Sequence, residues 1–234
     1  MELLLYRYLI MGIIEITFTE LLIKAHIITY GNAANPGITQ LIRDEIETMW
    51  NEPVVFVDLE GSRQVRFSIT AEYRHVISPE EVISNTDPRN NYFRIEDFAM
   101  GNISFVDGIG CNSGYFKAEN LYSGSTTAAH EFGHTIGLRH PKHLDLRGKG
   151  TPGIMYPRGT LVDPQFQYNP AAKAGDSTDG GTMHPKYRRV QVADILMLNL
   201  PMLAANNGQR IIGEFSSVWH PDHGTTGIKP DIRV

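Results

Sequence analysis

The chain has 234 residues, of which 41% are hydrophobic and 20% charged, and its formal net charge is −5 at pH 7. This composition is typical of a globular protein with a normal core in one domain, or in one domain divided into two lobes. The mildly acidic balance argues against nucleic acid as a partner, since Arg188 and Arg189 form the only adjacent basic pair. A single cysteine, Cys111, excludes an intramolecular disulfide framework and any metal site built on several thiolates.

Residues 1–23 are predicted to be an N-terminal extension of uncertain character. The apolar runs in this segment are interrupted by Arg7, Glu2 stands where a signal peptide has a basic residue, and no small-residue cleavage site follows. The segment is therefore a poor signal peptide, and it is too short to span a bilayer, so we expect no membrane span. A buried helix or strand, or the remnant of a longer parent chain, are the interpretations that stay open.

The first half of the chain predicts strands and one long helix. Residues 24–30 are predicted as a strand because they are rich in β-branched side chains and end at Gly31. Asn35 and Pro36 predict a helix start, with asparagine as the cap and proline in the first turn. Apolar side chains recur at helical spacing from there to about Trp50. Further along, we expect strands over 54–59 and 65–73, a short helix over 79–83 and a loop over 85–91.

The second half changes character near residue 140. Before that point, the sequence predicts a strand over 103–106, a turn over 107–110, an edge strand over 114–117 and a helix, capped by Ser125 or Thr126, that runs to about 138. After it, glycine and proline interrupt residues 141–185, helical spacing resumes over 189–200, and the tail 206–234 is predicted as loop with one short strand. This order predicts an α+β domain over 24–205 whose two lobes meet near residue 140.

The most informative segment reads H-E-x-x-H-x-x-G-x-x-H from His130 to His140. His130 and His134 lie four residues apart, so on a helix both imidazoles can reach one ion at about 2.0–2.1 Å. Glu131 lies about 100° further around the helix, so it can flank the ion without binding it. Gly137 tolerates positive φ, which lets the chain turn sharply and return His140 as third ligand. Three neutral nitrogens leave a fourth position for water, which is the open arrangement of a catalytic Zn²⁺ site.

The length of the motif makes it specific. With this chain's own residue frequencies, five fixed positions match by accident with a probability on the order of one in ten thousand. The shorter H-E-x-x-H occurs far more readily, so Gly137 and His140 carry the specificity. The competing interpretation is a helix with three incidental histidines.

A second string follows the motif. Met155 lies fifteen residues after His140, within the string G-I-M-Y-P. Together the two segments resemble the metzincin metallopeptidases, whose zinc motif is followed by a turn that contains methionine. The strings A-A-H-E-F-G-H and M-Y-P are most similar to the matrix-metalloproteinase branch, and the resemblance is strong over about residues 126–157. It implies a catalytic domain with a twisted mixed sheet and two helices in the N-terminal lobe and an irregular C-terminal lobe with one helix. It also implies that Met155 supports the metal from beneath without binding it.

The chain departs from this family pattern in four respects. Pro141 follows the third histidine, as in the serralysins, whereas matrix metalloproteinases usually have serine there. Pro157 takes the position of the tyrosine that can reach the metal in astacins and serralysins, so no tyrosine ligand is expected. No cysteine-switch string is found, and Cys111 lies mid-chain. The His-rich second zinc site is also missing.

The resemblance implies further site residues. Asp194 resembles the helix aspartate that accepts hydrogen bonds from the Met-turn backbone, and the competing interpretation is an exposed carboxylate. Residues 114–117 resemble the edge strand that pairs with an extended peptide, because a sheet edge presents unpaired N–H and C=O groups. The loop 158–186 is expected by its position to line the specificity pocket. The tentative substrate contacts are Gly114, Tyr115, Phe116, Tyr156 and Pro157.

The remaining candidates are weaker. His143 and Asp145 are either groups behind the metal ligands or exposed loop residues. His184, His220 and His223 have no ligand spacing. Residues 107–110 lack the alternating acidic positions of a calcium loop, so a turn is predicted there, and calcium is possible but not indicated.

These observations predict a zinc-dependent endopeptidase with Glu131 as general base and a peptide or protein as substrate. Two alternatives stay open: a zinc-binding interaction module without turnover, against which the presence of Glu131 argues, and a zinc amidase that acts on small molecules or cell-wall peptides. The chain from 29 to 200 is also similar to metallopeptidase domains at the ends of bacterial Rhs-type polymorphic toxins, and residues 5–8 resemble the close of such a repeat core. We therefore expect secretion or delivery outside the producing cell. The oligomeric state stays open.

Overall fold

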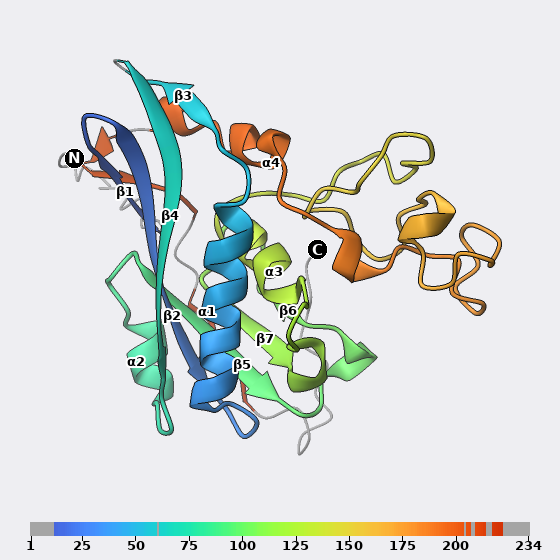
Figure 1. The fold of residues 1–234 in the computed structure, drawn as a ribbon. Helices are drawn as coiled ribbons and strands as arrows, with labels where there is room; N and C mark the ends of the chain where they lie inside the picture. The colour runs from blue at the N-terminus through green and yellow to red at the C-terminus, as the bar shows by residue number, and fades with distance from the viewer. Residues whose placement is uncertain (1–11, 60, 204, 207–208, 214–216, 222–234) are drawn as a thin grey trace, which may run out of the picture.

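The computed structural model describes residues 12–59, 61–203, 205–206, 209–213 and 217–221 (Figure 1). Within these residues one mixed sheet runs through the molecule, and helices pack on it, so the fold is α+β, as predicted. The strands are β1 (Ile13–Ile16), β2 (Glu20–Tyr30), β3 (Phe56–Asp58), β4 (Ser62–Tyr73), β5 (Asn90–Glu96), β6 (Phe105–Val106), β7 (Ser113–Lys117), β8 (Ala205–Asn206) and β9 (Gln209–Ile211). The α-helices are α1 (Pro36–Trp50), α2 (Pro79–Ile83), α3 (Thr127–Thr135) and α4 (Val192–Met197).

The long strand β2 organises the sheet. It pairs in parallel with β4 along one edge, and its other edge is shared by β1, which is antiparallel, and β5, which is parallel. Beyond β5 come β7, which is parallel, and β6, which is antiparallel and outermost on that side among the described strands. On the β4 side of β2, β3 pairs with β4. On the other side, β9 and β8 continue the sheet from β1.

The two faces of the sheet carry separate apolar clusters. Ile27 points into the main core, which lies between the sheet, α1 and α3, whereas Ile28 and Tyr30 point to the opposite face. This alternation follows from the two-residue period of a strand. On the opposite face, called the outer face below, the small cluster includes Val82 of α2. Figure 1 shows α1 and α3 lying side by side against the sheet.

Helix α1 fixes the position of α3. Asn35 caps α1 by accepting a hydrogen bond from the backbone N–H of Ile38 at 3.0 Å. At the other end of α1, Trp50 is fully buried, and its indole N–H donates to the carbonyl of Ala129 at 3.0 Å. The Trp50 ring also packs edge-on against Phe132. The apolar stripe of α1 therefore determines where α3, with its histidines, lies.

Two strands differ from the prediction. A loop was expected over 85–91, but β5 begins at Asn90 and its residues from 91 to 96 are all buried. Arg94 and Glu96 interrupt the apolar pattern by which a buried strand is recognised in a sequence. Their burial is tolerated because the two side chains form an ion pair. Strand β2 begins at Glu20, and β1 also lies in the sheet, so residues 13–23 are strands with a tight turn between them. Residues 1–11 lie outside the described part of the chain.

The prediction of an edge strand over 114–117 is wrong. Strand β7 is interior, because it pairs with β5 on one side and β6 on the other. Tyr115 and Phe116 are fully buried. A Cβ at Gly114 would lie 2.6 Å from the carbonyl oxygen of Phe105, so the close approach of β6 requires glycine there. The outer strand is β6, which is only two residues long. A sequence pattern does not show which of β6 and β7 lies at the edge of the sheet.

The C-terminal part is irregular, as predicted, but its helix is shorter. Helix α4 covers Val192–Met197, whereas helical spacing extends over 189–200 in the sequence. Helix α3 also ends early, at Thr135 instead of about 138. In the tail, β8 and β9 extend the sheet, and residues 217–221 return to it. Among the described residues, no helix combines the length and the apolar character needed to cross a membrane.

Candidate metal centre

Helix α3 is held in the core at its N-terminal end. All of its residues are buried. Glu45 of α1 accepts a hydrogen bond from the backbone N–H of Ala129 at 2.9 Å, and an acidic group in this position is favoured by the helix dipole. Burial raises the pKa of Glu45 to about 7, against the opposing effect of its hydrogen bonds. The carboxylate therefore helps to fix the helix that carries the histidines, and no pattern in the sequence indicates this role.

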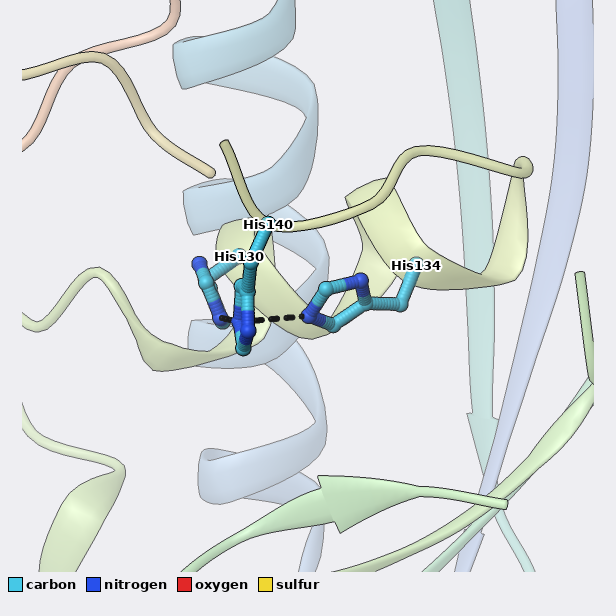
Figure 2. Close-up of side chains that lie close together, drawn as sticks. All are labelled: His130, His134 and His140. Carbon is cyan, nitrogen blue, oxygen red and sulfur yellow. Dashed lines mark hydrogen bonds between the residues drawn. The ribbon is translucent and has the colours of Figure 1, made fainter. Parts of the chain in front are cut away.

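Three imidazoles converge on one point (Figure 2). The Nε2 atom of His140 lies 3.1 Å from that of His130 and 3.1 Å from that of His134. All three ligand atoms lie within 4.8 Å of one another. Nitrogen ligands about 2.0–2.1 Å from a tetrahedral ion are roughly 3.4 Å apart. The three side chains thus have the spacing of ligands around one ion.

The protonation of the imidazoles also suits metal binding. The Nδ1–H of His130 donates to the carbonyl of Ile154 at 2.6 Å, and that of His134 donates to the carbonyl of Leu138 at 2.7 Å. Each bond leaves the Nε2 lone pair facing the shared point. Burial lowers the pKa of all three histidines, that of His134 to about 4. Neutral imidazoles are the form that binds a divalent transition metal, so the donor set fits such an ion.

A glycine turn delivers the third imidazole. Gly137 has φ +100°, and the N–H of Leu138 donates to the carbonyl of Gly133 at 2.9 Å, which closes the helix end. No atom lies within 4 Å of a Cβ built on Gly137, so the backbone conformation alone accounts for glycine at this position. The chain then reverses and brings His140 back over α3 (Figure 2).

Glu131 follows His130 on α3, and its side chain is buried. Its Oε2 accepts a hydrogen bond from the backbone N–H of Val106 in β6 at 3.2 Å. Burial raises the pKa of Glu131 to about 8, and the positive charge of Arg188 opposes this effect. The carboxylate is thus held on β6 and is not one of the converging ligand atoms, and a group with this pKa can exchange a proton near neutral pH.

Arg188 is a buried cation, whereas in the sequence it stands out only as half of the adjacent basic pair Arg188 and Arg189. It is 4% exposed. Its Nε donates to Thr126 Oγ1 at 3.3 Å, and its Nη1 donates to the carbonyl of Tyr156 at 3.1 Å. Burial lowers its pKa to about 10, against the attraction of Glu131 and Glu45. Arg188 therefore connects the start of α3 to the segment that follows Met155, and only tertiary structure places its charge there.

The Met155 turn lies directly under α3. Met155 is fully buried. A Cβ on Gly133 would overlap its sulfur, so α3 can rest on this side chain only because residue 133 is glycine. Asp194 of α4 is buried as well, so it is not the exposed carboxylate of the competing interpretation. Burial raises its pKa, and hydrogen bonds from the backbone N–H groups of Gln191 and Ile154 oppose this, so its carboxylate contacts the backbone of the turn.

We expect Gly133→Ala to destabilise the protein by about 1–3 kcal/mol, which is the usual cost of overpacking a core. The added methyl group displaces Met155 and pushes against Trp50, whose ring carbon would lie 3.1 Å from it. Denaturant unfolding of the two proteins measures the difference. Gly159→Ala is the matched control, because no atom lies within 4 Å of a Cβ there. Equal stability of both variants would contradict this account of Gly133.

The other predicted residues lie as follows. Tyr156 and Pro157 are partly buried and directly follow Met155, whereas Gly114, Tyr115 and Phe116 lie inside the sheet. His143 and Asp145 are exposed loop residues, and Asp145 pairs with Arg147. His184 accepts a hydrogen bond from Lys186 N–H, and His220 pairs with Asp107 in the predicted turn. His223 lies outside the described residues.

No protein-family model matches the chain, and no curated protein matches it. Among solved structures, the structure of myroilysin is similar over 77% of this chain and 94% of that chain, with 10% sequence identity and a TM-score of 0.38. A similarity at this level does not decide a family or an activity.

Proposed function

We propose that this protein is a zinc-dependent endopeptidase. The observation that carries the proposal is the convergence of three imidazole Nε2 atoms, together with the buried carboxylate of Glu131, the residue that follows His130 on α3. His130, His134 and His140 would hold the ion. When bound, zinc supplies Lewis-acid chemistry, since it polarises a carbonyl group and lowers the pKa of a bound water to about 7.

In this proposal Glu131 moves the proton. The hydrogen bond from Val106 N–H to Oε2 leaves Oε1 to accept a proton from the attacking water. The carboxylic acid then passes the proton to the leaving amine, so one residue serves as base and then as acid. Arg188 favours the charged state of Glu131 that begins the cycle. A carboxylate in this position has no use in a purely structural metal site.

The peptide substrate is proposed to lie along β6. This two-residue strand is outermost on its side of the sheet among the described strands, so an extended peptide can approach it there. Strand β6 contacts Glu131 through Val106, so a peptide added there would run past the metal centre. Tyr156, Pro157 and the loop 158–186 are proposed to form the neighbouring wall, which would set the cleavage preference.

We further propose that the protein belongs with the metzincins, nearest to the matrix-metalloproteinase branch, and that it acts outside the producing cell. The motif from His130 to His140, the turn at Met155 and the buried Asp194 support the first part. The weaker resemblance to Rhs-type toxin domains supports the second, although residues 5–8, which carry part of it, lie outside the described residues.

Hydrolysis assays test the proposed function. The purified protein is incubated with casein and a fluorogenic peptide library, with and without a chelator, and bound metal is measured. We expect cleavage that the chelator abolishes and added zinc restores. Bound zinc without cleavage of any substrate would favour an interaction module, and hydrolysis confined to cell-wall peptides or small amides would favour an amidase. Cleavage that persists in the chelator would contradict the proposal.

A further inference from the structure

Residues 217–221, called the C-terminal strap here, are fastened to the outer face of the sheet, opposite α1 and α3. Four consecutive residues of the strap have partners on the strands or on the residue before β7. The contacts join Ser217 Oγ to the Asn112 side chain at 2.8 Å, Val218 N–H to Ser113 Oγ at 2.9 Å, the ring of Trp219 to that of Tyr30 at 5.2 Å, and the carbonyl of His220 to Arg94 Nη1 at 2.8 Å. The sequence predicts loop with one short strand over 206–234 and gives no indication of these contacts.

His220 contacts the two residues that flank Val106. Its Nε2 lies 2.8 Å from Asp107 Oδ1, and the two side chains are only 4% and 12% exposed. Its ring packs edge-on against Phe105, with centroids 5.8 Å apart. These contacts with His220 bring Phe105 and Asp107 to the outer face, whereas Val106, which lies between them, points into the main core.

Val106 is the point where β6 meets the metal centre. Its N–H donates to Glu131 Oε2 at 3.2 Å, and the turn that follows donates a second hydrogen bond, from Gly110 N–H to the carbonyl of His134 at 2.7 Å. Strand β6 pairs with β7 at only two positions. Contacts from outside the strand ladder therefore contribute to holding β6 in place, and His220 provides one on each side of Val106.

We propose that His220 is a positioning residue for the metal centre: by holding Phe105 and Asp107, it keeps the Val106 N–H on the Glu131 carboxylate. The effect on catalysis rests on the proposed endopeptidase function, whereas the effect on Val106 does not. His220 lies on the far face of the sheet from the three imidazoles, so it acts only through β6.

Hydrogen exchange at the Val106 amide tests the positioning directly. We expect His220→Ala to speed this exchange by about tenfold or more, because the Val106 N–H is then no longer held on the Glu131 carboxylate. Exchange in β2 should not change. His220→Gln can still donate to Asp107 and should restore most of the protection. Val218→Ala is the matched control, because Val218 is 42% exposed and the substitution keeps its backbone N–H. Wild-type exchange at Val106 in His220→Ala would overturn the proposal.

Two further measurements complete the test. In peptide hydrolysis, His220→Ala should lower kcat by about tenfold with bound zinc unchanged, as expected when a reacting group loses its position, and unchanged kcat would count against the proposal. A chain that cleaves nothing but loses Val106 protection in this variant would refute the endopeptidase function and support the positioning role. If His220→Ala does not fold, hydrogen exchange of the wild-type protein in mild denaturant tests the proposal instead. Joint loss of protection at the Val106 and Val218 amides would support it. A Val106 amide that stays protected after the Val218 amide has begun to exchange would contradict it.

Discussion

Glu131→Gln is expected to lower kcat for peptide hydrolysis by about a thousandfold, within the 10²–10⁴ range for a positioned general acid–base group. Glutamine has the same shape, and its carbonyl can still accept the hydrogen bond from Val106 N–H, but it cannot take up the proton of the attacking water. The three imidazoles are untouched, so the bound metal per chain should stay the same. Activity and metal content measured on the same preparation separate the two effects.

Glu119→Gln is the matched control for this variant. Glu119 is exposed and pairs with Lys117 outside the metal centre, so its activity should equal that of the wild type. Hydrolysis by Glu131→Gln at the wild-type rate would contradict the proposed mechanism. Loss of metal together with activity would instead mean that Glu131 supports the ligands themselves.

Local rules account for what the sequence predicts correctly around the metal centre. His130 and His134 lie on one face because the helix repeat dictates it, and the turn at Gly137 depends on a single backbone angle, φ +100°. The start of α1 follows in the same way from Asn35 and Pro36. Each of these features is determined within about one helical turn of the residues that signal it.

Non-local pairing explains what the sequence does not predict. Whether β7 or β6 is outermost depends on which strands pair, and neither strand carries that information in its own residues. Arg94 and Glu96 disguise β5 because their mutual ion pair forms only after folding. The contact of His220 with Asp107 is also not predictable from the sequence, since the two residues lie more than a hundred residues apart along the chain.

The charged residues Glu45 and Arg188 near the metal centre are likewise placed by non-local contacts. Glu45 and Arg188 read as surface residues in the sequence, because such side chains are mostly exposed. The structure buries Arg188 and partly buries Glu45 beside the start of α3, where Glu45 accepts a backbone hydrogen bond and Arg188 donates to Thr126 and Tyr156. Their roles follow from three segments meeting in space, and no spacing within the chain signals that.

Zinc-linked stability should disappear in His134→Ala. A ligand that binds only the folded state at a thousand times its Kd adds about 4 kcal/mol, which raises Tm by roughly 8–16 °C for a chain of this size. His134 contributes one of the three converging Nε2 atoms, and its loss leaves two imidazoles that cannot hold the ion as tightly. Differential scanning fluorimetry with and without zinc measures the shift in each protein.

The zinc-induced shift, and not the Tm itself, is the quantity to compare. His134 also donates from Nδ1 to the carbonyl of Leu138, so its removal destabilises the metal-free protein by leaving a buried acceptor unpaired. His143→Ala is the matched control, because His143 is exposed and lies outside the cluster, and it should keep the full shift. A full shift in His134→Ala would place the ion elsewhere in the molecule, and the proposed endopeptidase chemistry would lose its foundation.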